Sequence, residues 1–392
     1  MGDGGRERMS RAPKKHGRPA LDTDPRPRQP LQGGRTLSRP ATIGDVARRA
    51  RVSRATVSRV INKYPHVRSQ VRTDVQRAIR ALRYRPDQVA RSLARRETQT
   101  LGLVVADITN PFYGETARAI VETARGHGYN VILCNTDNLS RLQEEYVEIL
   151  RQRRVDGIIF GSVFLRDPVV EALIDSGYPC LMYNRRLRSG RGNYIVLDNV
   201  RASRDLTTHL IRLGHRRIGF IAGLRETSTA ADRFRGYRQA LRTADLSVDP
   251  SLVRPGAFKS EMAQRAAQEL LKPRRRPTAI VAGNDLMALG VMQAAGEMGL
   301  RVPEDLAVAG FDDIQLSGHR AIQLTTMAQQ KTEMGRLAVG WILEIIRDPR
   351  RFARAPLQQL LAPTLVVRRT CGALAAPAQS GKPNVSTGRK RT

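Results

Sequence analysis

Two groups of side chains in this sequence are suited to binding rather than to catalysis. The first lies in RATVSRVIN at residues 54–62, where arginine and short hydroxyl side chains alternate with apolar residues. The second consists of Asn, Asp and Arg side chains that each follow an apolar run later in the chain. Arginine can bind guanine or phosphate through two parallel hydrogen bonds, whereas amides and carboxylates bind hydroxyl groups. We therefore expect a nucleic-acid surface and a separate small-molecule site.

The elements that position the first group are three short helices within residues 41–86. Apolar residues at positions 43, 46, 47 and 50 recur with helical spacing. Thr42 precedes them as an N-cap, and Asp45 can complete a capping box. A second helix begins after Ser53, and a third has an apolar face between Val71 and Leu82. Two short helices joined by a tight turn predict a helix-turn-helix.

The second of these helices has the properties of a DNA recognition helix. Val57, Val60 and Ile61 form its buried stripe, so the opposite face is exposed. The outward residues at its N-terminal end, from which such helices reach base edges, are Arg54, Ala55, Ser58 and Arg59. Short hydrogen-bonding residues at helix ends are suited to phosphate contacts, and these are Thr42, Ser53, Thr56 and Asn62.

The charge of the chain supports a polyanionic partner. The net charge is +31, and residues 1–100 carry 25 Lys and Arg against 8 Asp and Glu. A basic block at one end of a chain favours nucleic acid as the partner, and the helix-turn-helix indicates double-stranded DNA. Residues 1–40 and 372–392 lack periodicity and are predicted to be disordered tails. The first tail either adds nonspecific DNA affinity or reflects a start codon assigned too far upstream.

From residue 100 to 371, apolar β-rich runs alternate with amphipathic helical stretches, as in LGLVVA at 101–106 and GIIF at 157–160. This alternation predicts two α/β lobes, each with a doubly wound parallel sheet. We expect an N-lobe of residues 100–198 and 330–355 and a C-lobe of residues 199–329 and 356–371. Residues 87–99 link this part to the helix-turn-helix domain.

The second group of side chains lies where the predicted strands end. Each of these residues could by itself be a helix cap or a turn residue. Ligands bind at the carboxyl ends of parallel strands, and a cleft between two lobes would bring several such ends together. The expected contacts of a hydroxyl-bearing ligand, with two aromatic rings to stack on it, are Phe112, Tyr113, Asn184, Arg233, Asn284 and Asp312.

Other functional classes lack their signatures. The three cysteines, Cys134, Cys180 and Cys371, form no CxxC motif, and no phosphate-loop, nucleophile-elbow or zinc-protease motif is present. We therefore expect no enzymatic activity, no metal and no cofactor. No apolar run has the length of a membrane span, and no signal peptide precedes the basic segment, so a cytoplasmic protein is expected.

At the level of motifs, the chain resembles the LacI/GalR family of bacterial repressors. The resemblance lies in ATIGDVARRA at 41–50, VS at 52–53, TVS at 56–58, VIN at 60–62, YRP at 84–86 and VARSL at 89–93. It implies that Arg54, Ala55 and Arg59 select the operator. It also implies that residues 87–95, including Ala90, form a hinge helix on DNA, and that Leu93 wedges into the minor groove.

Similar motifs continue through the α/β part and imply a periplasmic-binding-protein-like sensor. These are NPFY at 110–113, RFRGY at 233–237, AGND at 282–285, GFDD at 310–313, and LTT with Gln329 at the predicted lobe crossover. Arg233, Asn284 and Asp312 are then the best effector contacts. Asn184 is a departure, since the family often has Asp there. Thr227 stands near an arginine of purine-sensing members, which disfavours a purine, and the set of Arg, Asn and Asp is more similar to sugar-binding members.

The resemblance implies a homodimer on a pseudo-palindromic operator. It also implies a small-molecule effector, which we expect to be a sugar or sugar acid, that changes the angle between the lobes. Whether the effector releases or recruits the protein stays open at this point. The alternative is a two-lobed sugar-binding protein without a regulatory role, which would have no use for residues 41–96.

Overall fold

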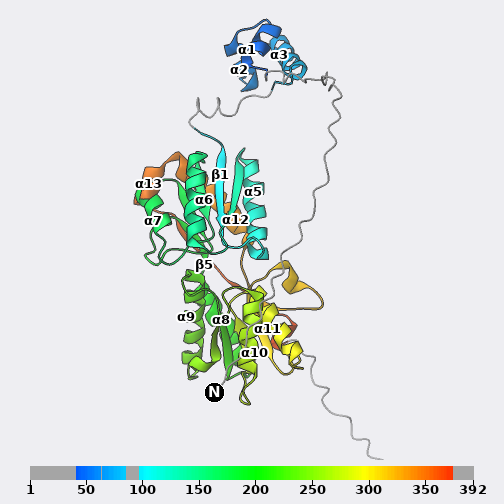
Figure 1. Ribbon diagram of the computed structural model, residues 1–392, viewed down its shortest axis with the longest axis vertical. Helices are drawn as coiled ribbons and strands as arrows, with labels where there is room; N and C mark the ends of the chain where they lie inside the picture. The colour runs from blue at the N-terminus through cyan, green and yellow to red at the C-terminus, as the bar shows by residue number, and fades with distance from the viewer. Residues whose placement is uncertain (1–40, 63, 85–96, 374–392) are drawn as a thin grey trace, which may run out of the picture. The chain divides into compact units, whose positions relative to one another are not determined.

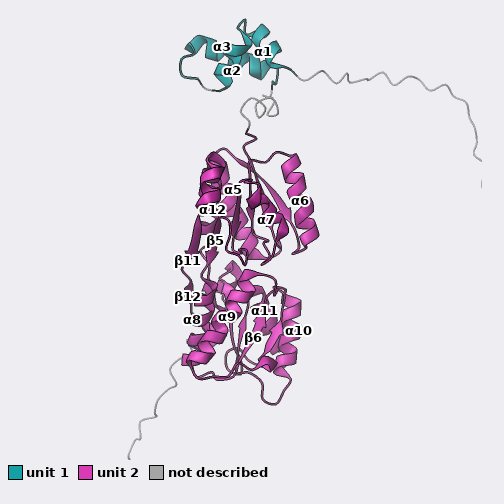
Figure 2. Ribbon diagram, turned by 90° about the vertical axis from the view of Figure 1, so that its left-hand side faces the viewer, with its two compact units in different colours: residues 1–86 teal, residues 87–392 magenta. Residues whose placement is uncertain are grey.

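The structure, a computed structural model, describes residues 41–62, 64–84 and 97–373. The chain divides into two compact units, residues 1–86 and 87–392, which Figure 2 shows in teal and magenta. The predicted tails up to residue 40 and from residue 374, together with the hinge residues Ala90 and Leu93, lie outside the described residues. Within the described ranges, no helix is long and apolar enough to cross a membrane.

The described residues of the first unit form the three predicted helices, α1 (Ile43–Arg49), α2 (Arg54–Ile61) and α3 (Ser69–Ala81). The capping box at the start of α1 is present, because the Thr42 hydroxyl accepts from the backbone of Asp45 and the Asp45 carboxylate accepts from the backbone of Thr42. The three helices bury a small common core that includes Val46, Val57 and Val75. This core fixes which face of α2 is exposed.

The N-lobe of the second unit is built on a sheet of six parallel strands in the order β11-β5-β4-β3-β1-β2. The strands are β1 (Thr100–Val105), β2 (Asn130–Asn135), β3 (Gly157–Phe160), β4 (Cys180–Tyr183), β5 (Tyr194–Leu197) and β11 (Gln358–Leu361). The helices are α5 (Pro111–Gly126), α6 (Ser140–Gln152), α7 (Pro168–Asp175), α12 (Lys331–Arg347) and α13 (Pro349–Arg354). Helices α5 and α12 pack together on one face, and α6 and α7 cover the other (Figure 1).

The C-lobe has the sheet order β12-β10-β9-β8-β6-β7. Its strands are β6 (Ile218–Ala222), β7 (Val253–Pro255), β8 (Ala279–Ala282), β9 (Ala307–Asp312), β10 (Thr325–Ala328) and β12 (Thr364–Val366). Its helices are α8 (Asn199–Arg212), α9 (Ser228–Thr243), α10 (Ser260–Leu271) and α11 (Asp285–Glu297), with 3-10 turns η1 (Pro250–Leu252), η2 (Gln315–Gly318) and η3 (Arg369–Cys371). Helices α8 and α9 pack on one face, and α10 and α11 pack on the other.

The last stretch of the chain corrects one predicted boundary. The expected N-lobe segment 330–355 extends to residue 361, because β11 pairs with β5 and Leu361 is buried in the core beside it. The C-lobe segment therefore begins after residue 361 rather than at 356. The same passage explains why β12 is antiparallel to β10. The parallel strands of both sheets end at the cleft, so a strand that enters the C-lobe directly from the cleft must run away from it.

Candidate functional site

Helix α2 presents a polar face that the core leaves free. Val57 and Val60 are buried, whereas Arg54, Ala55 and Arg59 are exposed. The predicted division of this helix into a buried stripe and an outer face is thus present. The exposed side chains lie on the first two turns, from which a recognition helix reaches bases in the major groove.

The short polar residues around α2 hold its ends in place. Ser53 is the N-cap, and its hydroxyl accepts from the Thr56 amide at 3.1 Å and lies 2.9 Å from the Thr56 hydroxyl. At the other end, the Asn62 amide nitrogen donates to Ser58 at 3.3 Å. Capping of this kind is worth about 0.5–2 kcal/mol. These residues therefore have a structural role, and the phosphate contacts predicted for them stay a prediction.

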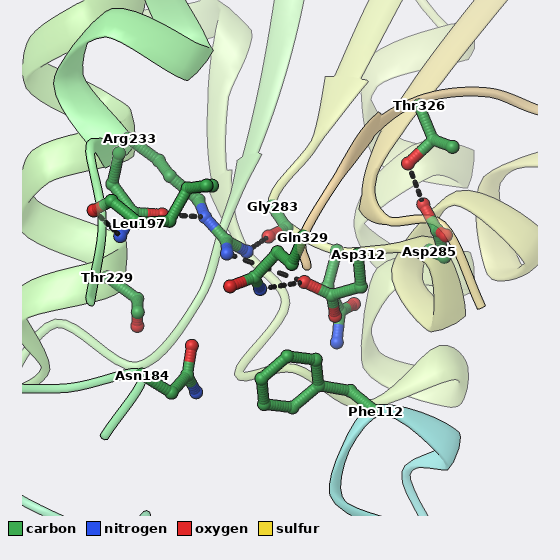
Figure 3. A network of polar contacts seen from close by, with 12 residues as sticks. Phe112, Asn184, Leu197, Thr229, Arg233, Gly283, Asp285, Asp312, Thr326 and Gln329 are labelled. Carbon is green, nitrogen blue, oxygen red and sulfur yellow. Dashed lines mark hydrogen bonds and ion pairs between the residues drawn. The ribbon is translucent and has the colours of Figure 1, made fainter. Parts of the chain in front are cut away.

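In the second unit, side chains from both lobes meet in one cleft. Six residues predicted from strand ends line it, namely Phe112, Tyr113, Asn184, Arg233, Asn284 and Asp312. Figure 3 shows Phe112, Asn184 and Thr229 around the space next to Arg233 and Asp312. Gln329 does not line the cleft, but its amide nitrogen donates to Asp312 Oδ1 at 2.7 Å from the crossover after β10. The strand ends therefore converge as the topology requires.

A buried ion pair lies on the C-lobe side of this cleft. Arg233, on α9, donates through Nη2 to Asp312 Oδ1 at 3.4 Å, through Nε to Asn199 Oδ1 at 2.8 Å, and through Nη1 to the carbonyl of Gly283. Its guanidinium carbon also lies 4.4 Å from the centre of the Phe311 ring. Burial lowers the pKa of Arg233 while Asp312 opposes that shift, and burial raises the pKa of Asp312 against the attraction of Arg233.

A second carboxylate lies behind this pair. Asp285, the first residue of α11, is fully buried and accepts from the hydroxyls of Thr326 at 2.6 Å and Ser317 at 2.7 Å and from the Ile314 amide at 3.0 Å. Burial, with repulsion from Asp312, raises the pKa of Asp285 to about 7. Because its oxygens are bound by η2 and β10, Asp285 anchors those elements beneath the cleft and does not line it.

The N-lobe side of the cleft combines aromatic rings with an amide. The rings of Phe112 and Tyr113, at the start of α5, are 5.2 Å apart in an edge-to-face arrangement. The Tyr113 hydroxyl donates to the Gly161 carbonyl and accepts from Asn184 Nδ2 at 3.3 Å. Asn184 has a left-handed backbone with φ of 63°, and its Oδ1 is buried without a hydrogen-bond partner in the described residues. A ligand hydroxyl would satisfy that oxygen.

Eight further residues line the cleft, and four of them, Asp107, Arg185, Phe258 and Lys259, supply charges or an aromatic ring. Asp107 and Arg185 lie two residues after the ends of β1 and β4, so the position rule that selected Asn184 could have found them. Phe258 and Lys259 follow β7, which has three residues and gives no strand signal. Lys259 Nζ lies 2.5 Å from Asp107 Oδ2 and ties the two lobes together. Burial raises the pKa of Asp107, but its bonds with Lys259 and Thr109 outweigh this and hold it below its usual value.

The arrangement is suited to binding a small molecule. No group of three or more His, Cys, Asp and Glu residues that could hold a metal occurs in the described part of the chain. The cleft offers paired charges, amides and aromatic rings, which are the donors, acceptors and apolar faces needed by a polyhydroxylated or ring-shaped ligand.

Comparison with known sequences matches both units of the chain. Residues 42–87 match the model described as "Bacterial regulatory proteins, lacI family", and residues 207–371 match a periplasmic binding protein-like domain. The chain is 36% identical over 332 residues to the HTH-type transcriptional repressor PurR of Edwardsiella ictaluri (strain 93-146), covering 84% of this chain and 96% of that protein. It is 38% identical over 299 residues to catabolite control protein A of Priestia megaterium, covering 76% and 90%.

Solved structures give the same result. The Lac repressor dimer bound to operator and the anti-inducer ONPF superimposes with a TM-score of 0.77 at 29% identity, covering 85% of this chain and 99% of that one. The transcriptional regulator CelR in complex with cellobiose gives a TM-score of 0.62 at 30% identity, covering 84% and 99%. The chain thus belongs to the lacI family of bacterial regulatory proteins, and it is a DNA-binding transcriptional repressor rather than an enzyme.

Proposed function

We propose that this protein is a homodimeric repressor of metabolic genes in the bacterial cytoplasm, associated with the nucleoid, whose operator affinity is set by a sugar or sugar acid in the interlobe cleft. Two copies of α2 would read the half-sites of a pseudo-palindromic operator, since two-fold protein symmetry requires two-fold site symmetry. The hinge residues Ala90 and Leu93 would contact the minor groove between the half-sites.

The observation that carries the effector proposal is the polar set around Arg233. A buried guanidinium and carboxylate at 3.4 Å lie in one cleft with the Asn184 amide and the Phe112 ring. Vicinal hydroxyls bind such a set well, because each hydroxyl can donate to a carboxylate and accept from a guanidinium. The apolar face of a sugar ring can then stack on the aromatic wall.

A purine is the second candidate, since PurR proteins are among the relatives and the rings of Phe112 and Phe258 both line the cleft. One residue argues against it. Thr227 is fully buried, and its hydroxyl donates to the Leu224 carbonyl at 2.7 Å while capping α9. It therefore supplies no charged donor for a base.

The effector is tested by thermal unfolding of the full-length protein with panels of sugars, sugar acids and nucleobases. A sugar or sugar acid should raise the midpoint of the wild type, because a ligand that binds only the folded state stabilises it. Asp312→Ala should abolish this shift. Asp313→Ala is the matched control, because Asp313 pairs with Arg368 and does not line the cleft. A shift caused only by nucleobases, or one retained in full by Asp312→Ala, would overturn the proposal.

The DNA surface is tested by operator footprinting. Arg54→Ala and Arg59→Ala should each weaken specific protection by about 5- to 150-fold, the equivalent of one lost bidentate base contact, while nonspecific binding is largely kept. Arg77→Ala, which removes an exposed arginine of α3 that pairs with Asp74, is the control. If both α2 variants protect the operator as the wild type does, α2 is not the recognition helix.

A further inference from the structure

One cation in the cleft has no carboxylate partner. Arg185 follows β4, lines the cleft and is 2% exposed. Its Nη1 donates to Asn138 Oδ1 at 3.0 Å, and its Nε has no hydrogen-bond partner in the described residues. Among those residues no carboxylate forms an ion pair with it, and the centre of the Phe258 ring lies 5.6 Å from its Cζ.

The other charges of the cleft are matched. Arg233 pairs with Asp312 within the C-lobe, and Lys259 pairs with Asp107 across the lobes. The lining therefore contains three cations and two carboxylates, and Arg185 is the cation in excess. Removing a guanidinium from water without an opposing charge is strongly unfavourable in general. An anion bound in the cleft would supply the counter-charge that Arg185 lacks and so offset this cost.

The residue before it needs the opposite kind of partner. Asn184 Oδ1 is a buried acceptor without a donor, whereas Arg185 Nε is a buried donor without an acceptor, again within the described residues. One ligand with both a hydroxyl and an anionic oxygen meets the two needs and also supplies a counter-charge. The hydroxyls of a neutral sugar can donate to Asn184 and accept from Arg185, but they leave the charge of Arg185 unmatched. An unsubstituted purine has no anionic oxygen at neutral pH.

The helix dipoles point in the same direction. Helices α5, α9 and α11 all begin at the cleft, where Tyr113, Thr229 and the N-cap Asn284 line it. The N-terminal end of a helix carries partial positive charge and favours an anion nearby. These ends add to the positive potential that Arg185 supplies.

We propose that Arg185 binds the anionic group, a carboxylate or a phosphate, of a hydroxylated effector, and thereby selects sugar acids or sugar phosphates over neutral sugars. This inference rests on the proposed sugar-binding function and makes it narrower. It assigns the effector's hydroxyls to Asn184 and to the Arg233 and Asp312 pair, and it assigns the effector's charge to Arg185.

The test is isothermal titration of the full-length protein with hexoses and pentoses, each as the neutral sugar, its acid and its phosphate ester, for example glucose, gluconate and glucose 6-phosphate. The wild type should bind at least one acid or ester about tenfold or more tightly than the neutral parent, and which of the two binds identifies the anion. Arg185→Gln should weaken that ligand by at least about tenfold, as expected for one lost charged hydrogen bond, and leave the neutral parent within about twofold. Arg185→Lys should restore part of the selectivity.

Arg188→Gln is the matched control, because the neighbouring Arg188 is exposed and does not line the cleft, so it should not affect the ratio of acid to neutral affinity. A neutral sugar that binds as tightly as its acid, in a manner abolished by Asp312→Ala, would overturn the role of Arg185 and leave the proposed function intact. Selectivity that persists in both Arg185→Gln and Arg185→Lys, at wild-type affinity, would also overturn it. If no sugar, acid or ester binds, the proposed function fails, and this inference fails with it.

Discussion

Replacing Asp312 should show how strongly the cleft depends on its buried ion pair. The carboxylate side chain is 5% exposed and that of Arg233 is 3% exposed, so Asp312→Ala leaves a guanidinium in a site that water scarcely reaches. Removing one partner of a buried pair is in general destabilising by about 3–5 kcal/mol. Arg233 keeps its bonds to Asn199 and Gly283 and its contact with the Phe311 ring. We therefore expect a loss near the lower end of that range, about 3 kcal/mol.

The contribution of the pair itself is measured by a double-mutant cycle with Arg233→Met. In the double variant the uncompensated charge is gone, so its loss of unfolding free energy should be smaller than the sum of the single losses by about 1–3 kcal/mol. Asp312→Asn isolates the charge, because the amide oxygen can still accept from Arg233 and the volume is kept. It should lie between the wild type and Asp312→Ala.

The assay is urea unfolding followed by circular dichroism at pH 7 and low salt, with the slope against urea checked for constancy across the variants. Additive losses, within about 0.5 kcal/mol, would refute the reasoning, because they would mean that the two side chains do not sense each other. Equal stability of Asp312→Ala and the wild type would refute it as well, since a buried guanidinium would then need no counter-charge.

Three further predictions concern packing, titration and capping. Gly236→Ala should lower the midpoint of thermal unfolding, because a Cβ there would lie 2.2 Å from the Val200 carbonyl oxygen where α9 packs against α8. Gly114→Ala is the control, because the space around Gly114 is open, and it should leave the midpoint unchanged or raise it slightly. Asp285 binds its proton more tightly when folded, with a pKa near 7 against an ordinary 3.8, so its contribution to stability falls as pH rises from about 4 to 7. Asp285→Asn should therefore flatten that fall in urea titrations at several pH values, and an unchanged pH slope would contradict the burial argument. Thr42→Ala should reduce the stability of the first unit by about 0.5–2 kcal/mol in thermal unfolding, because it removes the N-cap of α1. An unchanged unfolding midpoint would contradict this role of Thr42.

What the sequence predicts well is set by short-range interactions. The capping box of Thr42 with Asp45 and the buried stripe of Val57 and Val60 involve residues within one helix turn of each other, so spacing alone predicts them. The convergence of Phe112, Asn184 and Asp312 in one cleft also follows from a general rule, because parallel strands end at the same edge of their sheet.

What the sequence misses depends on contacts between distant segments. Strand β11 has four residues and could join the edge of either lobe, and the choice is made by its register with β5. Lys259 follows a strand of three residues, and its partner Asp107 is 152 positions away. The unmatched charge of Arg185 is visible only after every other charge in the cleft has been assigned a partner.

The pairing of charges across the cleft bears on how an effector could control DNA binding. The pairs of Lys259 with Asp107 and of Arg186 with Asp232 join the two lobes. An effector can therefore act in two ways. It can add contacts to both lobes and favour this lobe arrangement, or it can take Lys259 or Asp107 for itself and release the bridge. The first kind of ligand binds the bridged arrangement more tightly, and the second binds the unbridged one. Coupling between two ligands is reciprocal. Operator DNA must therefore raise the affinity for an effector that prefers the same lobe arrangement as DNA does, and lower the affinity for an effector that prefers the other arrangement. Whether the effector strengthens or weakens operator binding thus depends on whether the operator-bound dimer keeps the Lys259–Asp107 bridge.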